Sequence, residues 1–177
     1  MMRDHFDAVW RSAKRLGLDA GRAEDVAQRA FMVAAEKLES IEIGKEKAYL
    51  LGVTTRLASD ARKSVFYLRG RSLDTPNAPS YQARTSSPED LVSRDQALRI
   101  LDEALALLPD ELRDVFVLSQ VEEFTMQEIS AMLEIPSGTV ASRLRRARAA
   151  FGEALTQWVP MEDRASWMRM VAGEVFE

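Results

Sequence analysis

The stretch from Ser137 to Phe151 constrains the fold more than any other part of the chain. It holds four arginines and no acid, inside a chain whose formal net charge is −4. Placed on a helix at about 100° per residue, its apolar residues recur on one side, as in a helix packed on a core. These inward positions are Val140, Leu144, Ala147, Phe151 and the following Leu155. The stretch therefore predicts a long amphipathic helix with a basic outer face.

A short capped segment and a turn precede this basic helix. Thr125 and Glu128 have the spacing of a capping box, which opens a helix. The run Ile135-Pro136-Ser137-Gly138 ends that helix, and we expect Ser137 to cap the next one. A short helix, a tight turn and a long basic helix predict a helix-turn-helix, whose second helix enters the DNA major groove. The alternative is a helical hairpin with a solvated arginine face, which the absence of acids on that face disfavours.

Composition excludes several classes of function. The 177 residues contain no cysteine, so we expect no disulfide framework and no thiolate metal site. No apolar run approaches the roughly 18 residues that span a bilayer, and no signal peptide opens the chain, which predicts a cytoplasmic protein without membrane insertion. We find no phosphate-binding loop, dinucleotide fingerprint, activated nucleophile or metal cluster. We therefore expect no enzymatic activity, catalytic residue, cofactor or metal.

Charge is distributed unevenly along the chain. Residues 1 to 68 hold 12 Lys and Arg against 10 Asp and Glu, whereas residues 94 to 157 hold 7 against 11. The acids of the second segment lie almost entirely before the basic helix, between Asp95 and Glu134. Because acids near a phosphate contact weaken it, we expect weak DNA binding by the isolated chain and a partner that brings it to DNA.

Three helices are predicted before the middle of the chain, at about 3–16, 22–39 and 46–66. The buried stripe of the third is expected to be Leu50, Val53, Leu57 and Ala61. Hydroxyls and cations occupy its opposite face, which is a second candidate nucleic-acid surface: Thr55, Arg56, Ser59, Arg62 and Lys63. The outer face of the second helix carries Glu24, Asp25, Gln28, Arg29 and Met32, either as solvated surface or as a contact surface.

The middle of the chain loses its apolar periodicity. Residues 69–93 are rich in Pro, Ser and Thr, which predicts a flexible linker between two domains. Leucine stripes predict a helix that restarts near Ser87, within the C-terminal part of this segment, and another helix over 110–121. Residues 158–177 form an apolar extension with a helix start at Pro160, expected to pack on its own domain or to dock on a partner. The predicted fold is all-α, with two small helical domains at 1–68 and 94–157, the linker between them and this C-terminal helical extension.

The chain resembles the extracytoplasmic-function (ECF) sigma factors, promoter-recognition subunits of bacterial RNA polymerase. Leu108-Pro109, the segment 125–130 and the segment 138–148 are similar to sigma region 4. Glu24-Asp-Val-Ala-Gln-Arg-Ala-Phe31 and the segment 48–63 are similar to region 2. The match runs over about residues 4 to 157 in the family's order.

The resemblance implies roles for the surfaces described above. Minus-35 duplex contacts are implied for Thr139, Ser142, Arg143, Arg145, Arg146 and Arg148. Minus-ten contacts are implied for Lys45, Thr55, Arg56, Ser59, Arg62 and Lys63, with the segment 40–47 as the loop that captures a flipped base. Contacts with core polymerase are implied for Glu24, Asp25, Gln28 and Phe31.

The implied partners are core RNA polymerase, through its β′ clamp helices and β flap, promoter DNA and an anti-sigma factor. Two residues depart from the family pattern: Arg56, where asparagine is common, and Ala141, where a basic residue is common. The alternative function is a sigma mimic that sequesters an anti-sigma factor without directing transcription. Such a mimic has no need of the basic surfaces.

Overall fold

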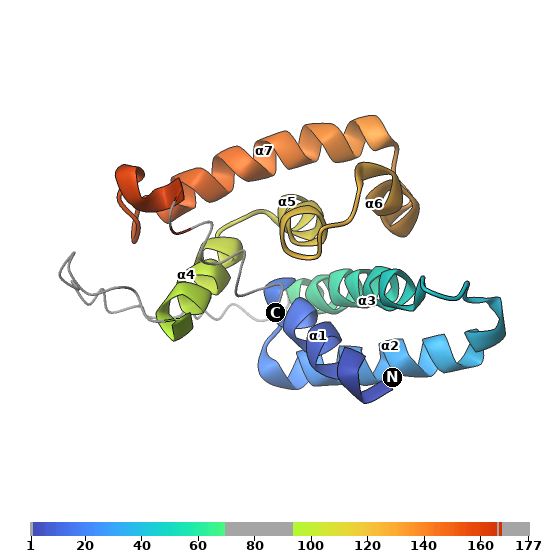
Figure 1. The fold of residues 1–177 in the computed structure, drawn as a ribbon. Helices are drawn as coiled ribbons and strands as arrows, with labels where there is room; N and C mark the ends of the chain where they lie inside the picture. The colour runs from blue at the N-terminus through green and yellow to red at the C-terminus, as the bar shows by residue number, and fades with distance from the viewer. Residues whose placement is uncertain (1, 70–93, 166, 168–177) are drawn as a thin grey trace.

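The computed structural model describes residues 2–69, 94–165 and 167, and all regular structure in these residues is helical. The first helices are α1 (Met2–Arg15), α2 (Ala20–Glu36), a 3-10 turn η1 (Leu38–Ser40) and α3 (Glu46–Arg69). The later ones are α4 (Arg94–Ala106), α5 (Asp110–Phe116), a π-helical turn η2 (Val117–Val121), α6 (Met126–Leu133), α7 (Ser137–Leu155) and a 3-10 turn η3 (Met161–Asp163). The predicted all-α fold is confirmed for the described residues (Figure 1).

Helices α1 and α2 form an antiparallel pair. Gly17 ends α1 with φ of +93°, a left-handed conformation that glycine adopts without steric cost. Asp19 caps α2, since its Oδ1 accepts a hydrogen bond from the Arg22 backbone N–H at 3.0 Å. Alanines along its inner face let α2 approach its neighbours closely: Ala23, Ala27, Ala30 and Ala34 are all buried.

The buried stripe of α3 differs from the predicted one. Val53, Leu57 and Ala61 are only half-buried. The most buried positions are Leu50, Leu51, Thr54, Thr55 and Ala58. The expectation that Thr55 is exposed is wrong, because both threonines turn their hydroxyls to the helix. Thr54 donates to the Leu50 carbonyl at 2.7 Å and Thr55 to the Leu51 carbonyl at 2.8 Å, which satisfies each hydroxyl without water.

The helix-turn-helix is present at the predicted place. Thr125 and Glu128 form the predicted capping box at the start of α6, with Glu128 Oε2 accepting from the Thr125 N–H at 2.9 Å. These hydrogen bonds lower the pKa of Glu128. The expectation that Ser137 caps the basic helix is wrong: Pro136 is the N-cap, and Ser137 is the first helical residue of α7. The segment predicted as one helix over 110–121 becomes α5 followed by the π-helical turn η2.

The described part of the C-terminal extension packs on the helices before it. Val159 and Trp167 are each 4% exposed and belong to the same apolar cluster as Phe151 and Leu101. The Trp167 ring lies 6.5 Å from that of Phe151, which in turn lies 4.4 Å from Phe116. These contacts favour the expectation that the extension packs on its own domain. Residues 166 and 168–177 lie outside the described residues, as do the helix start near Ser87 and most of the predicted linker, 70–93.

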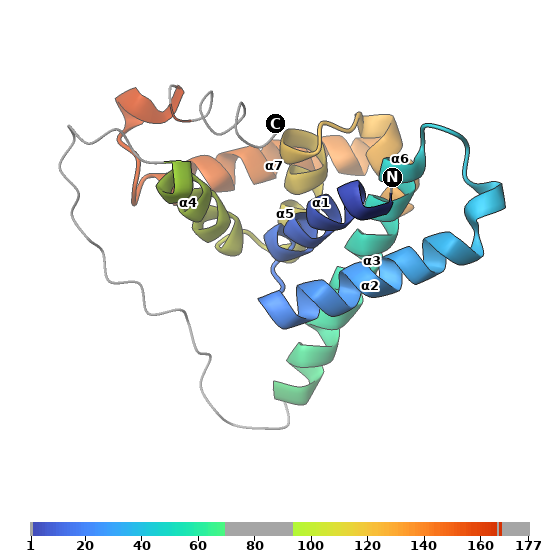
Figure 2. The same ribbon diagram turned by 60° about the horizontal axis from the view of Figure 1, so that its bottom comes forward.

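The helices before and after the linker pack directly against each other. Figures 1 and 2 show α4, α5 and α6 between α7 and the three N-terminal helices. One apolar cluster joins Leu16 and Ala58 to Leu105 and Leu112, and another joins Val9 and the inner face of α2 to Ile129. The sequence did not predict how the two halves are arranged. In the structure they pack against each other through these two apolar clusters.

Candidate nucleic-acid interface

The outer face of α7 is the most accessible basic surface among the described residues. Arg145 and Arg146 are exposed on the side opposite the buried stripe, and Arg148 is exposed on its flank. Ser142 is also exposed and donates its hydroxyl to the Thr139 carbonyl at 3.0 Å. Helix α7 lies on the side of the fold away from α1, α2 and α3 (Figure 1). The structure therefore leaves four of the six predicted minus-35 residues exposed: Ser142, Arg145, Arg146 and Arg148.

Arg143 differs from the other arginines of α7. Its Nη2 lies 2.7 Å from Glu111 Oε2 on α5, and its side chain is only 25% exposed. Thr139 is half-buried near the start of the same helix. These two residues flank the exposed face, where a side chain meets the phosphate backbone more readily than base edges.

The predicted minus-ten residues of α3 are not all exposed. Ser59 is half-buried and Lys63 is exposed. The C-terminal end of α3 extends past the other helices (Figure 2). Arg62, however, has a side chain only 9% exposed, so the expectation that it is exposed is wrong. With Thr55 also buried, two of the five predicted α3 contacts are inaccessible in this arrangement.

Arg62 of α3 is held by groups from α5 and from the turn that follows α1. Its Nη1 donates to the Leu16 carbonyl, its Nη2 donates to both carboxylate oxygens of Asp114 at 2.9 and 2.8 Å, and its Nε lies 3.1 Å from Asp110 Oδ2. Burial raises the pKa of Asp114 to about 6, although the charge and hydrogen bond of Arg62 act in the opposite direction. Arg113 donates to the same Leu16 carbonyl, at 3.4 Å.

Arg56 is half-exposed and bonded to the helix-turn-helix. Its Nε and Nη2 donate to the Met132 carbonyl at 3.1 and 3.0 Å, and its Nη2 lies 2.9 Å from Glu134 Oε1. The residue that departs from the family pattern thus joins α3 to the end of α6.

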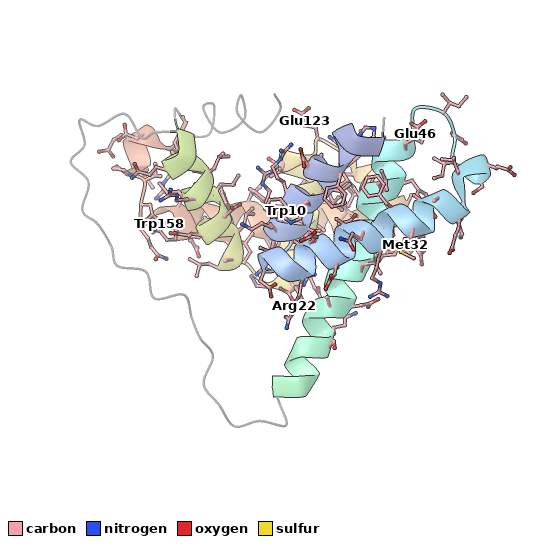
Figure 3. The ribbon with its side chains drawn as sticks, turned by 90° about the horizontal axis from the view of Figure 1, so that it is seen from below. Trp10, Arg22, Met32, Glu46, Glu123 and Trp158 are labelled. Atoms are coloured by element: carbon pink, nitrogen blue, oxygen red, sulfur yellow. The ribbon has the colours of Figure 1, made fainter. Side chains whose placement is uncertain are left out.

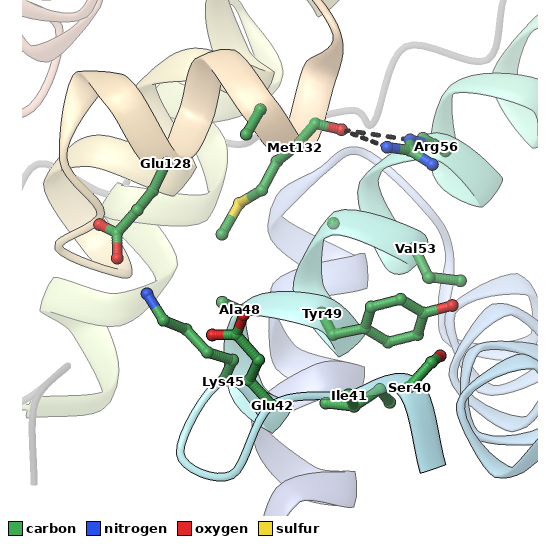
Figure 4. A pocket seen from close by; sticks show the side chains of 12 residues that line it. Ser40, Ile41, Glu42, Lys45, Ala48, Tyr49, Val53, Arg56, Glu128 and Met132 are labelled. Carbon is green, nitrogen blue, oxygen red and sulfur yellow. Dashed lines mark hydrogen bonds between the residues drawn. The ribbon is translucent and has the colours of Figure 1, made fainter. Parts of the chain in front are cut away.

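A cavity of about 330 Å³ lies beside Arg56, between the loop 40–47 and α6. Ser40, Ile41, Glu42, Lys45, Tyr49, Val53, Glu128 and Met132 are among its lining residues (Figure 4). Lys45 extends across its mouth toward Glu128. Tyr49 presents the face of its ring to the cavity, a stacking surface that the sequence analysis missed because an aromatic residue early in a helix gives no signal distinguishing it from core.

The outer face of α2 is accessible along its length. Arg22 and Met32 lie toward its two ends (Figure 3), and Glu24, Asp25 and Gln28 are exposed between them. Phe31 is half-buried and stacks on Phe6 of α1 with ring centroids 5.8 Å apart. Met32 is 64% exposed.

Neither a metal-binding group of side chains nor a membrane-spanning helix occurs among the described residues. Within residues 2–69, 94–165 and 167, no group of three His, Cys, Asp or Glu side chains is placed to hold a metal ion. None of the helices in the part of the chain that the structure describes is long and apolar enough to cross a membrane.

Comparisons with known proteins match both halves of the chain. Family models of Sigma-70 region 2 and of Sigma-70, region 4 match residues 1–65 and 98–151. The ECF RNA polymerase sigma factor SigW of Bacillus subtilis is 30% identical over 156 residues, which cover 84% of this chain and 83% of SigW. The ECF RNA polymerase sigma-E factor of Escherichia coli K12 is 29% identical over 141 residues, covering 74% of this chain and 72% of that protein.

A solved structure is similar over most of the fold. The sigma factor RpoE in complex with the anti-sigma factor NepR, from Bartonella quintana, superposes with a TM-score of 0.64 and 25% identity. The match covers 85% of this chain and 91% of that one. Because both sigma regions occur in order along one chain and the relatives match most of their length, the chain belongs to the ECF sigma factors, non-catalytic transcription initiation factors of bacterial RNA polymerase.

Proposed function

We propose that this sigma factor divides promoter recognition between two domains, at 1–68 and 94–157, joined by the linker 69–93. The second domain reads minus-35 duplex DNA and the first opens and holds minus-ten DNA. The observation that carries the proposal is the exposed arginine face of α7, which holds no acid from Ser137 to Phe151, in a chain that also exposes Arg56 and Lys63 on α3. A mimic that only sequesters an anti-sigma factor has no use for either face.

Minus-35 recognition is assigned to α7. Ser142, Arg145 and Arg146 face the major groove, where arginine on guanine is the commonest specific base contact. Thr139, Arg143 and Arg148 lie nearer the phosphates. Ala141 is exposed on the same helix and contributes no charge, so the specificity of this sigma factor rests more heavily on its neighbours.

Minus-ten recognition is assigned to the cavity beside α3 and to the cations around it. Tyr49 offers an aromatic face to an unstacked base, and Lys45, Arg56 and Lys63 offer charge to the strand. Ser59, Arg62 and Thr55 complete the predicted set, and the last two require rearrangement before they can reach DNA. Capturing a flipped base offsets an unpairing cost of a few kcal/mol, so strand opening needs no nucleotide hydrolysis.

The α2 face is assigned to core polymerase, with Glu24, Asp25 and Gln28 as polar contacts and Phe31 as an apolar one. The β′ clamp helices are its proposed partner, and the β flap is the proposed partner of the second domain. A cytoplasmic location and an anti-sigma partner follow from the same proposal. The RpoE relative bound to NepR supports the latter.

Run-off transcription with purified core polymerase tests the function. The full chain should direct transcription from a promoter selected with it, and Arg146→Ala should weaken that promoter by about 1 to 3 kcal/mol and relax preference at one minus-35 position. Arg99→Ala is the matched control, because Arg99 is an exposed arginine of the same domain on α4. Equal losses for the two variants would contradict the assignment of Arg146. Tight anti-sigma binding without a transcript from any selected promoter would favour the mimic.

A further inference from the structure

We propose that the acidic surface of α4, α5 and α6 substitutes for promoter DNA in the free protein, holding the cations of the first domain and covering its minus-ten site. The proposal rests on the assignment of that site to α3. It implies that the two domains must separate before single-stranded minus-ten DNA can bind.

Every ion pair that joins the two halves among the described residues has the same polarity. The cation comes from the N-terminal helices and the acid from the C-terminal ones. The pairs are Arg15 with Asp102 at 4.0 Å, Lys47 with Glu122 at 3.2 Å, Arg56 with Glu134 at 2.9 Å, and Arg62 with Asp110 at 3.1 Å and Asp114 at 2.8 Å. The acids that make the second segment negative are therefore placed opposite the cations of the first. Two of these cations, Arg56 and Arg62, belong to the proposed minus-ten site.

The acidic surface of α4, α5 and α6, hereafter the lid, holds Arg56 by one edge of its guanidinium. Both of its bonds to protein acceptors use the edge of the guanidinium that carries Nε and Nη2. The Met132 carbonyl is one of the last four of α6, which have no partner within the helix, so Arg56 caps α6. A phosphate or a guanine edge that binds this same fork of donors would displace the Met132 carbonyl and the Glu134 carboxylate. Binding of either ligand by this edge therefore releases the end of α6.

Glu134 contacts Arg56 from an unusual backbone conformation. Glu134 ends α6 with φ of 55°, a left-handed conformation in which glycine is the usual residue. Glutamate at this position is strained and places a carboxylate on Arg56 of the other domain.

The contacts of Arg62 with Asp114 and the Leu16 carbonyl keep this arginine from binding DNA. Its donors are occupied by Asp114 and by the Leu16 carbonyl, and the side chains of Arg62 and Asp114 are 9% and 12% exposed. Buried pairs of this type fix how two surfaces meet more than they stabilise the contact. Together with the contact at Arg56, this pair fixes α3 against the second domain at two separate points.

Helix α6 also covers the cavity directly. Its residues Glu128, Ala131 and Met132 line the cavity opposite the loop 40–47, and Figure 4 shows Met132 reaching in from the α6 side. A Cβ atom at Gly52 would lie 3.6 Å from the Met132 Cβ, so the two helices touch at this point. By contrast, the α7 arginines and the outer α2 face stay exposed. The closed protein can therefore meet polymerase and duplex DNA before it meets the strand.

A disulfide across this contact tests the lid. The chain has no cysteine, and the 3.6 Å separation at 52 and 132 falls within the range of about 3.5 to 4.5 Å found in disulfides. Oxidised Gly52→Cys/Met132→Cys should lose at least about tenfold in run-off transcription and in binding of single-stranded minus-ten DNA, and reduction should restore both, because the locked protein has no open population. Each single-cysteine variant is the control and should not respond to oxidant.

Binding of minus-35 duplex DNA measures whether the disulfide affects only the minus-ten site. It should stay within about twofold of the reduced protein, since α7 remains exposed in the closed state. Equal strand binding by the oxidised and reduced forms would overturn the lid. Loss of duplex binding on oxidation would also overturn it. If Lys63→Ala in the reduced protein leaves strand binding unchanged, the minus-ten assignment itself fails, which is a separate outcome.

Charge reversal tests whether the acids of the second domain occupy cations that would otherwise bind minus-ten DNA. Glu134→Lys opposes Arg56, whereas Glu123→Lys makes the same change at an exposed residue that joins no pair between the halves among the described residues. Glu134→Lys should raise affinity for single-stranded minus-ten DNA at least about threefold above Glu123→Lys. It should also make the salt dependence steeper by about 0.7 in log–log slope for each cation freed from an acid. Equal effects of the two variants would show that net charge alone matters and would refute the proposal.

Discussion

Trp167 gives the sharpest test of how the C-terminal extension is attached. Its side chain is 4% exposed and its ring lies 6.5 Å from Phe151, within the apolar cluster that α4, α5 and α7 share with the N-terminal helices. Replacing a buried tryptophan by alanine costs about 3 to 5 kcal/mol of unfolding free energy, through lost burial and the cavity left behind. Trp167→Ala should therefore lower the free energy of unfolding by about that amount.

Trp167→Phe separates ring packing from the indole N–H. The Trp167 Nε1 is buried and has no hydrogen-bond partner among the described residues, and such an unpaired donor costs about 1 to 3 kcal/mol. Phenylalanine keeps an aromatic ring against Phe151 and removes that donor, so the loss of area and the removed penalty act in opposite directions. We expect a change within about 1 kcal/mol. Met161→Ala, at a residue that is 77% exposed in the same extension, should change stability by less than about 0.5 kcal/mol.

Urea unfolding followed by far-ultraviolet circular dichroism measures these differences, because helix content reports on the whole fold and does not depend on the substituted indole. A loss below about 1 kcal/mol for Trp167→Ala would show that the extension is not part of the core. Equal losses for alanine and phenylalanine would show that the indole N–H has a partner and that the packing argument is incomplete.

Three further predictions concern the cap, the interface and the recognition helix. Thr125→Ala should lower the free energy of unfolding by about 0.5 to 2 kcal/mol, since it removes the hydroxyl that accepts the Glu128 N–H. Urea unfolding measures this loss. An unchanged free energy of unfolding would mean that α6 does not depend on its capping box. Burial raises the pKa of Asp114 to about 6 in the closed arrangement, so closure is most favourable at low pH and should weaken by about 1 kcal/mol from pH 5 to 7, as the closed-state carboxyl ionises. Energy transfer between dyes on Lys37→Cys and Ala149→Cys, two exposed positions, reports closure of the two halves. Asp114→Asn should remove the change in energy transfer between pH 5 and 7. A change that persists in this variant would assign the pH dependence to another group. Arg146→Ala should reduce the affinity for minus-35 duplex by about 5- to 150-fold in a fluorescence binding assay, whereas a uniform loss on all sequences would mean that Arg146 touches only phosphate.

Local signals in the sequence predicted the helix-turn-helix well. The capping box is present, and every residue of the predicted α7 stripe, Val140, Leu144, Ala147, Phe151 and Leu155, is buried. These features depend on residues close together in the chain, whose geometry is set by the helix itself. The start of α7 was less predictable, because Pro136 and Ser137 are both acceptable first residues and only the backbone conformation distinguishes them.

The face of α3 could not be predicted from one helix alone. This helix packs on α1 and α2 with one side and on α6 with another, so positions that a single-stripe analysis assigns to solvent are buried. Thr55 follows this pattern, because a threonine hydroxyl bonded to a carbonyl one turn earlier can be buried at little cost. Arg62 is buried only because acids about fifty residues later surround it. The sequence contains both partners but gives no signal that pairs them.

The uneven charge of the chain has a structural explanation in these pairs. Sequence analysis predicted that acids of the second segment would weaken DNA binding by lying near the recognition helix. Among the described residues, Glu111 does lie 2.7 Å from Arg143 of α7, but Asp102, Asp110, Asp114, Glu122 and Glu134 contact cations of the first domain instead. Exposed pairs such as Arg56 with Glu134 are worth at most about 1 kcal/mol each, so apolar contacts provide most of the closure and the charges decide which surface of α3 is covered. Because DNA and these acids present the same charge to the same side chains, binding of one excludes the other, and core polymerase needs only to shift a balance between two similar ligands.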